Sequence, residues 1–379
     1  MGEEGRAPRV LILAGEASGD HHAARVVETV SARRPEVEWV GLGGPELEAL
    51  GVETWAGLDR LAVMGFVEVI RHLGFFRKLE KRAVAALDSG AIDLVLAVDY
   101  PGFNLRIARK AHDRGVPVLF YVAPQVWAWK SHRAKQLADW ADRIAVILPF
   151  EPPIFEAEGG DVEFVGHPLA ERDDAESPSR EIRHDLGVAS DAPLLALLPG
   201  SRAQELDRHL DPFVDAARRL RELHPDLVPV LAVAPGVDGE RFRATGLPVT
   251  AHTRALLRAS RAAIVKSGTS TLEAALAGVP FVMAYRTSFL TWALAKRLVK
   301  VDHIALANLV ADRRVVPELL QGDVTGQRLA DAVQPLMVDG EAREVMLQDL
   351  EDVRRRLGGP GASGRVAEMA LELLEERGR

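Results

Sequence analysis

The chain has no cysteine among its 379 residues, which excludes disulfides, thiolate metal sites and cysteine nucleophiles and fits a reducing cytoplasm. Basic residues are in the minority, since 47 lysines and arginines stand against 55 aspartates and glutamates, for a formal net charge of −8. Because phosphate backbones select basic surfaces, a general nucleic-acid-binding role is disfavoured. No window offers the roughly eighteen uninterrupted apolar residues of a spanning helix, and the first residues lack a signal-peptide cleavage pattern. Any membrane contact is therefore expected to be peripheral.

What the chain does contain is the composition of a globular α/β protein. Hydrophobic residues make up 47% and charged residues 27% of it, and the length suits two domains. In the first half, short apolar runs alternate with segments of helical spacing, a pattern that favours a parallel sheet covered on both faces. The predicted strands of this half are Val10–Ala14, Asp93–Val98, Val116–Val122 and Arg143–Leu148.

A polar stretch over residues 171–190 separates this half from a second α/β series. We therefore expect a doubly wound domain over residues 1–170, a linker region over 171–190 and a second doubly wound domain over 191–379 with a charged, helical C-terminal tail. The two domains would face each other across a cleft, and ligands would bind beyond the carboxyl ends of the strands. The predicted strands of the second half are Leu194–Leu198, Leu227–Ala234, Ala262–Val265 and Pro280–Ala284.

A turn rich in small residues follows the first of these strands, in the segment LLALLPGSRAQ. Gly200 permits close backbone approach, Ser201 can cap a helix or bond an oxygen, and Arg202 carries a planar charged fork suited to a diphosphate. Backbone N–H groups at such a strand-to-helix turn also bind phosphate. The alternative is an ordinary turn with a solvated arginine.

A second turn of this kind occurs in VKSGTSTLE, about sixty residues later. Its hydroxyls and N–H groups, on Ser267, Gly268 and Thr269, can bind phosphate oxygens, and Glu273 can accept a hydrogen bond from a ribose hydroxyl. The alternative is a capped helix in which Glu273 completes a capping box. Two such turns in equivalent places predict a site for a nucleotide or nucleotide-sugar.

The loop GEASGD follows the first strand and opens a helix, but it is not the GxGxxG dinucleotide fingerprint. The charge of Glu16 would repel a pyrophosphate. With Ser18 it is better suited to sugar hydroxyls or to positioning an acceptor. The alternative is a capped turn, with Asp20 or Ser18 as the cap.

Asp99 ends the strand Asp93–Val98 and precedes the turn YPGFN. A carboxylate at the carboxyl end of a buried strand points into the predicted cleft, where it can take a proton from a hydroxyl. A surface aspartate that caps the next helix is the alternative, and Asn104 would then help to cap or orient. The pair His21–His22 lacks metal-ligand spacing, since adjacent side chains diverge on a helix.

The stretch Leu61–Phe76 (LAVMGFVEVIRHLGFF) carries more apolar side chains than a solvent-facing linker warrants, and basic residues follow it closely. This is the pattern of an interfacial element on an anionic membrane, with Val63, Met64 and Phe66 as the predicted contacts. A second basic amphipathic stretch is Phe289–Val301. An ordinary core helix with basic ends is the competing interpretation.

Several long and unusual segments of the chain resemble one family, lipid-A-disaccharide synthase, an inverting glycosyltransferase family of the GT-B class. They keep their order from residue 13 to about residue 311. The segments are LAGEASGD, LAVMGFVEV, VDYPGFN, YVAPQVWAWK, LPFE, FVGHPLAE, LLPGSRAQE, SGTSTLE, LAKRLVK and HIALANLVA. The chain departs from the family pattern at Gly102, where an acidic residue is usual, and at the pair His21–His22.

The resemblance implies two Rossmann-like domains and a cytoplasmic enzyme bound peripherally to the inner membrane of Gram-negative bacteria, in lipid A biosynthesis. It implies transfer of 2,3-diacylglucosamine from UDP-2,3-diacylglucosamine to 2,3-diacylglucosamine 1-phosphate (lipid X), which gives a β-1,6 disaccharide and UDP. No metal or other cofactor is implied. Asp99 and Arg202 fall on essential positions of the family, Glu16 and Ser18 in its functional N-terminal loop, and Asn308 in its asparagine-containing segment.

Other functions remain open at this point. Another UDP-sugar enzyme on the same fold, such as a UDP-N-acetylglucosamine epimerase or a peptidoglycan-type transferase, would not need the apolar stretch. A nucleotide-sugar-binding regulatory protein would not need a base at Asp99. Acyl-chain length and oligomeric state, a homo-oligomer included, cannot be read from the residues.

Overall fold

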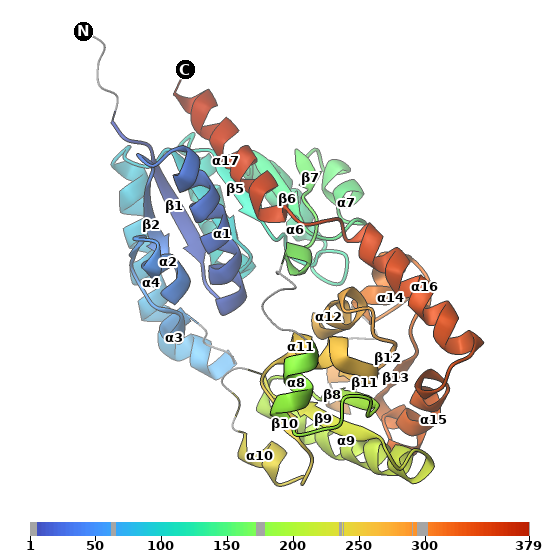
Figure 1. Cartoon of the computed structure of the whole chain (residues 1–379). Helices are drawn as coiled ribbons and strands as arrows, with labels where there is room; N and C mark the ends of the chain where they lie inside the picture. Colours follow the sequence, from blue (N-terminus) through green and yellow to red (C-terminus); the bar gives the residue numbers. More distant parts are fainter. Residues whose placement is uncertain are drawn as a thin grey trace. The chain divides into compact units, whose positions relative to one another are not determined.

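The computed structural model of the chain describes residues 6–61, 66–171, 179–234, 237, 239–289, 291–293 and 302–378. They form two compact units, Met1–Glu171 with Gly359–Arg379, and Arg172–Gly358. Each unit is built on one parallel sheet with helices on both of its faces, so the predicted fold class of doubly wound α/β domains with a helical C-terminus is confirmed (Figure 1).

The sheet of the first unit has seven strands, all parallel. Alternate side chains of one strand serve the two faces: Val10 and Ile12 pack under two helices, α1 (Ala17–Arg33) and α17 (Ala362–Arg377). Leu11 and Leu13 face the other side, toward helices α4 (Phe66–Asp88) and α5 (Pro101–His112). In spatial order the strands are β3 (Glu53–Thr54), β2 (Glu38–Leu42), β1 (Arg9–Ala14), β4 (Leu94–Val98), β5 (Val118–Tyr121), β6 (Arg143–Val146) and β7 (Val162–Phe164).

The remaining helices of this unit connect successive strands on one face or the other (Figure 1). Such strand–helix–strand connections keep the sheet parallel. They are α2 (Pro45–Ala49), α3 (Leu58–Leu61), α4 (Phe66–Asp88), α5 (Pro101–His112), α6 (His132–Trp140), α7 (Pro152–Glu156) and the 3₁₀ turn η1 (Pro168–Glu171).

The second unit repeats the strand order of the first on six parallel strands. In space they are β10 (Val249–Thr250), β9 (Val228–Ala232), β8 (Leu194–Leu198), β11 (Ser260–Lys266), β12 (Phe281–Tyr285) and β13 (Glu318–Leu320). The helices are α8 (Ser179–Asp185), α9 (Ala203–Leu223), α10 (Glu240–Arg243), α11 (Thr253–Ala259), α12 (Ser270–Leu276), α14 (Leu306–Ala311), α15 (Gly326–Met337) and α16 (Glu341–Arg356), with a 3₁₀ turn η3 (Gln321–Asp323). The order reverses between β1 and β4 in the first sheet and between β8 and β11 in the second, and ligands of doubly wound sheets bind at such switch points.

The last helix lies elsewhere than the sequence-based division placed it. That division put all of residues 191–379 in the second domain, whereas α17 packs against α1 and the sheet of the first unit. Ser363 near its start donates from its hydroxyl to Glu171 over 2.6 Å. The first unit is therefore assembled from two distant segments of the chain.

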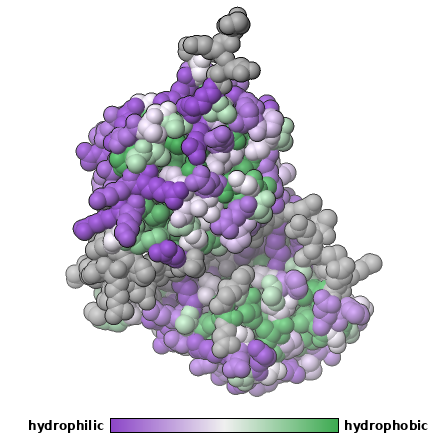
Figure 2. Space-filling view, turned by 90° about the vertical axis from the view of Figure 1, so that its left-hand side faces the viewer, coloured by the Kyte–Doolittle hydropathy of each residue, from purple (hydrophilic) through white to green (hydrophobic). Residues whose placement is uncertain are grey.

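The described ends of the apolar stretch Leu61–Phe76 belong to the core of the first unit. Leu61 is fully buried, and Phe75 and Phe76 pack against the cluster that contains Phe103. Val63 and Met64 lie outside the described residues, as does the side chain of Phe66. Their predicted contact with a membrane therefore stays a prediction. On the side of the molecule that carries β2 and α4, hydrophilic and hydrophobic residues are interspersed (Figure 2). Within the part of the chain that the structure describes, no helix is both long and apolar enough to cross a bilayer.

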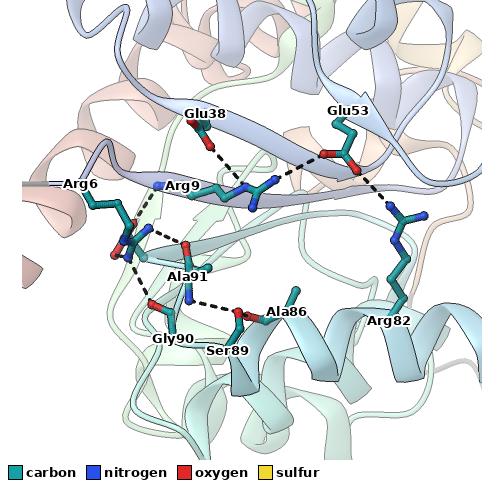
Figure 3. Close-up of polar contacts among 10 residues, drawn as sticks. Arg6, Arg9, Glu38, Glu53, Arg82, Ala86, Ser89, Gly90 and Ala91 are labelled. Carbon is teal, nitrogen blue, oxygen red and sulfur yellow. Dashed lines mark hydrogen bonds and ion pairs between the residues drawn. The ribbon is translucent and has the colours of Figure 1, made fainter.

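One of the basic residues after this stretch is engaged within the protein. Arg82 on α4 pairs with Glu53 of β3 over 3.0 Å (Figure 3). Its guanidinium also lies over the ring of Trp55. Glu53 also pairs with Arg9 of β1, which in turn reaches Glu38 of β2 over 3.5 Å. Exposed pairs of this kind are worth about 1 kcal/mol or less each. The ion pair of Arg82 with Glu53 thus links α4 to β3 at the edge of the sheet.

Candidate functional site

The loops after β1 and β4 meet at the switch point of the first sheet. Gly15 has to be small there, because a Cβ on it would come within 2.6 Å of the Tyr100 ring. Glu16 follows as the exposed N-cap residue of α1, and Asp99 follows β4. The structure therefore brings Glu16 and Asp99 to the same edge of the sheet, close enough for the charge of Glu16 to act on Asp99.

The backbone at Asp99 is held in an unusual conformation. Asp99 and Tyr100 both have φ of +47°, in the left-handed region that residues with a side chain rarely adopt. The buried amide of Asn104 donates to the carbonyl oxygens of Asp99 over 2.7 Å and of Leu13 over 3.0 Å. The N-cap of α5 is Tyr100, so the structure does not support the alternative that Asp99 caps this helix. Strained backbone of this kind is concentrated at functional sites.

The surroundings of Asp99 raise the pKa of its carboxyl group toward neutral pH. Burial raises the pKa of Asp99 to about 6, and the negative charge of Glu16 adds to the rise, against a hydrogen bond from the Tyr100 N–H. At neutral pH the group is therefore ionised yet basic enough to accept a proton from a hydroxyl that is losing it.

Asp20 serves the fold, and its partners belong to another helix. Only 2% of Asp20 is exposed, and its carboxylate accepts hydrogen bonds from the N–H groups of Gly44 over 2.7 Å and Glu46 over 3.1 Å. These groups begin α2, so Asp20 caps α2. The alternative considered from the sequence was that Asp20 caps α1, the helix that contains it. Ser18 lies exposed in the first turn of α1.

A pocket of about 230 Å³ opens beside Asp99 at the ends of β4, β5 and β6. Its buried acid, Glu151, is 1% exposed and accepts hydrogen bonds from Trp127 Nε1 over 3.2 Å and from the Leu148 N–H over 2.9 Å. Burial raises the pKa of Glu151 to about 7, although these hydrogen bonds oppose the rise. Three polar and aromatic side chains from the segment after β5 also line the pocket, namely Gln125, Trp129 and Arg133.

Sequence reasoning missed this pocket because it assigned no residue in YVAPQVWAWK or LPFE. The signal was present, since these segments follow the predicted strands Val116–Val122 and Arg143–Leu148 just as the Asp99 turn follows its own strand. Neighbouring parallel strands bring their carboxyl ends to one edge, which places Glu151 and Trp129 near Asp99.

The second switch point joins the two predicted phosphate-binding turns. Glu205, in the first turn of α9, accepts a hydrogen bond from the Ser201 N–H over 3.0 Å and another from Lys266 Nζ, at the end of β11, over 2.7 Å. The guanidinium of Arg202 is 3.6 Å from the same carboxylate. Gly200, at φ +127°, leaves room for Glu205, because a Cβ would lie 2.6 Å from its Oε2. Lys266 is a further cation of this site that the sequence analysis did not assign.

The groups around Glu205 keep its carboxyl group ionised. Burial opposes ionisation of Glu205, but the hydrogen bonds from Lys266 and from the Ser201 N–H hold its pKa below the usual value. An ionised carboxylate thus rests among a lysine, an arginine and a backbone N–H, which are the groups that bind phosphate in proteins.

The turn after β11 leaves its hydroxyls at the same edge. Ser267 and Gly268 are half-buried, and Thr269 is exposed as the N-cap residue of α12 without a capping hydrogen bond from its side chain. Since the helix begins at Ser270, Glu273 lies one position beyond the place that a capping box requires. The capping-box alternative is therefore not what the structure shows.

Asn308 lies elsewhere in this unit. It is fully buried in α14, where its amide group donates to the Val316 carbonyl over 3.0 Å and to Glu318 over 2.8 Å. Its oxygen accepts from the N–H groups of Val315 and Val316. All its hydrogen-bonding capacity is thus used in holding α14 to β13, and its predicted contact with substrate remains a prediction. Among the described residues, no group of three or more histidine and acidic side chains could hold a metal ion.

Sequence comparison identifies relatives along the whole chain. The family model described as lipid-A-disaccharide synthetase matches residues 10–371. A lipid-A-disaccharide synthase of Myxococcus xanthus is 42% identical over 97% of this chain and 98% of its own length. One from Anaeromyxobacter sp. strain K is 43% identical over 97% of each chain.

Solved structures with little sequence similarity share the fold. A putative UDP-N-acetylglucosamine 2-epimerase from Listeria monocytogenes matches with a TM-score of 0.66 at 15% identity, over 98% of both chains. The glycotransferase of kitacinnamycin matches with a TM-score of 0.64 at 18% identity, over 98% of this chain and 100% of that one. The family match over residues 10–371 and the relatives at 42% and 43% identity establish that the chain belongs to the lipid-A-disaccharide synthase family of glycosyltransferases.

Proposed function

We propose that the chain transfers 2,3-diacylglucosamine from UDP-2,3-diacylglucosamine to 2,3-diacylglucosamine 1-phosphate, with inversion, and so forms a β-1,6 disaccharide and UDP. Family membership supports the substrates. The observation that carries the chemistry is the half-buried carboxyl of Asp99 at the switch point of the first sheet, with a pKa of about 6.

Asp99 acts as the general base. It takes the proton of the acceptor's 6-hydroxyl, whose oxygen forms the new bond to the anomeric carbon on the face opposite UDP. The bond between that carbon and the β-phosphate oxygen breaks, and its electron pair leaves with UDP. Glu16 raises the proton affinity of Asp99, and Asn104 fixes the backbone at Asp99 through its amide hydrogen bond. Ser18, exposed in the first turn of α1, belongs to the acceptor-positioning loop.

The second unit binds UDP. Charge that builds on the departing diphosphate is met by Arg202 and Lys266, by the Ser201 N–H at the start of the long helix α9, and by the hydroxyls of the Ser267–Thr269 turn. Gly200 allows the close approach, and Glu273 accepts a hydrogen bond from the ribose. Glu205 now holds the Lys266 ammonium and the Ser201 N–H, so phosphate has to exchange with this carboxylate when it binds.

The test is UDP release by the purified protein with both diacylated substrates in detergent micelles. Asp99→Asn keeps the size of the side chain and removes the base, so kcat should fall by about 10²–10⁴-fold, the usual contribution of general-base catalysis. UDP should bind Asp99→Asn as tightly as wild type, within about twofold. Asp113→Asn, an exposed acid just past α5, is the matched control and should leave kcat unchanged. Equal losses of UDP affinity and kcat in Asp99→Asn would contradict the assignment.

We further propose that the enzyme works at the cytoplasmic face of the inner membrane, bound peripherally through Val63, Met64 and Phe66. Full burial of one large apolar side chain is worth about 1.5–3 kcal/mol. Replacing Met64 and Phe66 with Ser should therefore weaken co-sedimentation with anionic phospholipid vesicles by roughly tenfold or more. Leu50→Ser, a partly exposed apolar residue at the end of α2, is the control and should leave it unchanged. Unaltered partitioning of the double variant would count against this surface.

A further inference from the structure

An exposed tryptophan flanked by two cations lines the pocket beside Asp99. Trp129 is 49% exposed, and its ring faces the Lys130 ammonium at 4.3 Å and the Arg133 guanidinium at 5.9 Å from the ring centre. Trp129 and Arg133 line the pocket together with Asp99. Among the residues that the structure describes, no carboxylate forms an ion pair with either cation. On the Trp129 side of the pocket, Arg133 of the lining and the neighbouring Lys130 thus carry two positive charges that no ion pair within the described part of the chain engages.

The backbone around this pocket is strained at more than one point. Val122, which lines it, has φ of +62°, and Lys130 has φ of +54°. The left-handed region is a genuine outlier for a β-branched residue such as valine. With Asp99, three of the residues that line or flank the pocket adopt this conformation. Such strain persists where the surroundings hold a side chain in a required place.

We infer that this pocket, the Trp129 pocket, binds the phosphorylated sugar ring of the acceptor, with Trp129 against the ring and Arg133 and Lys130 on the phosphate monoester. The inference rests on the proposed function and assigns a place to the acceptor's phosphate. An aromatic face packs against the apolar C–H groups of a sugar. The arginine fork fits phosphate oxygens, and two cations match a group that carries about −1.5 to −2 charges.

The charges of the pocket also orient the ring. Asp99 and Glu151 are carboxyl groups and repel a phosphate, so the phosphate has to lie on the side of Arg133 and Lys130. The acceptor's hydroxyl groups then face the two acids, where they donate hydrogen bonds. The ring is thereby held with its attacking hydroxyl toward Asp99, so one subsite selects the phosphorylated acceptor and aligns it for transfer.

The test is equilibrium binding of soluble probes, followed by NMR titration, to wild type and two matched variants. Arg133→Met removes the pocket arginine, whereas Arg109→Met removes an arginine that lies over Trp140 at 5.8 Å and lines no part of the pocket. Wild type should bind glucosamine 1-phosphate at least tenfold more tightly than glucosamine or inorganic phosphate. Arg133→Met should lose this preference, and Arg109→Met should keep it. Trp129→Ala should weaken glucosamine and glucosamine 1-phosphate alike.

Two results would overturn the inference. One is equal binding of inorganic phosphate and glucosamine 1-phosphate by wild type, which would mark a plain anion site. The other is an Arg133→Met variant that behaves as Arg109→Met does.

Turnover measurements distinguish a failure of the Trp129 pocket inference from a failure of the proposed function. In the micelle assay Arg133→Met should raise the acceptor KM at least tenfold and leave the donor KM within about twofold. UDP release by wild type with an unaltered acceptor KM in Arg133→Met overturns the Trp129 pocket alone. Absence of UDP release by a wild-type protein that still binds glucosamine 1-phosphate through Arg133 overturns the proposed reaction alone.

Discussion

At the scale of single residues, the titration of Asp99 connects its place in the fold with its chemistry. Burial disfavours the ionised form, and the nearby charge of Glu16 does the same, so the pKa rises to about 6. Because this pKa lies above that of an unfolded aspartate, ionisation of Asp99 costs stability as pH rises toward 6. The same shift makes the carboxylate a stronger base at neutral pH.

We expect kcat/KM to rise with pH through an acid limb near pH 6, as Asp99 loses its proton. Glu16→Gln removes the negative charge that raises this pKa, so the limb should move to lower pH. The move should be less than about one pH unit, since an exposed charge such as that of Glu16 typically contributes about 1 kcal/mol or less. A pH–rate profile of each protein measures it, with the distant, exposed Glu36→Gln as control. A limb that stays in place or moves upward in Glu16→Gln would show that Glu16 does not act on the titrating group.

The place of a residue could be predicted where it follows from the strand pattern, whereas its role stays a prediction. Glu16, Asp99 and Arg202 lie in the turns after buried strands, and parallel strands gather such turns at one edge of their own sheet. Asp20 and Asn308 look equally polar in the sequence, but their partners are backbone groups of Gly44 and Val316. Nothing local in the chain announces which distant backbone groups a buried polar side chain will satisfy.

At the scale of elements, the ion pair of Glu205 with Lys266 connects the end of β11 to the start of α9. In this arrangement the Glu205 carboxylate accepts hydrogen bonds from Lys266 and the Ser201 N–H, the donors that a phosphate would also use. Glu205→Gln removes the competing charge, so UDP should bind several-fold more tightly. Lys266→Met removes a cation of the site and should weaken UDP binding by roughly tenfold, about 1.4 kcal/mol.

Calorimetric titration with UDP measures both effects. Glu222→Gln, an exposed acid at the far end of α9, is the control and should bind UDP as wild type does. Weaker binding by Glu205→Gln would mean that Glu205 chiefly orients Lys266, against the competition argued above.

The helices and strands differ in how accurately their bounds could be predicted from the sequence. The strand Leu194–Leu198 has the predicted bounds, because a fully buried apolar run ends at a Pro-Gly turn. GEASGD was predicted to be a loop that precedes a helix, but α1 begins at Ala17 within it, so most of this segment is itself helical. Glu38–Leu42 was not predicted as a strand, because a short run that opens with a charged residue and contains glycine lacks a strong pattern.

At the scale of the whole molecule, local sequence patterns could not predict which unit the C-terminal helix joins. The helical pattern of the tail was predicted, and α15, α16 and α17 confirm it. An apolar helix face, however, does not state which sheet it will cover. Contacts of α17 with segments far away in the sequence decide that: Arg365 donates to the Val165 carbonyl over 2.8 Å, and Arg143 to Glu372 over 3.0 Å.

Because α17 completes the first unit alone, damage to it should leave the second unit intact. Val366 is fully buried between α17 and the sheet that contains β1 and β4. In Val366→Asp an unpaired charge would be buried, at a cost of several kcal/mol, so α17 should detach. Amide hydrogen exchange measured by mass spectrometry should rise in β1, β4 and α1, whereas β8 and β11 stay protected and UDP affinity stays within about twofold. Glu368→Gln is the control, since it removes only an exposed ion pair with Arg33. If exchange rose equally in β8 and β11, the two units would unfold as one, and the assignment of α17 to a separate cooperative unit would have to be abandoned.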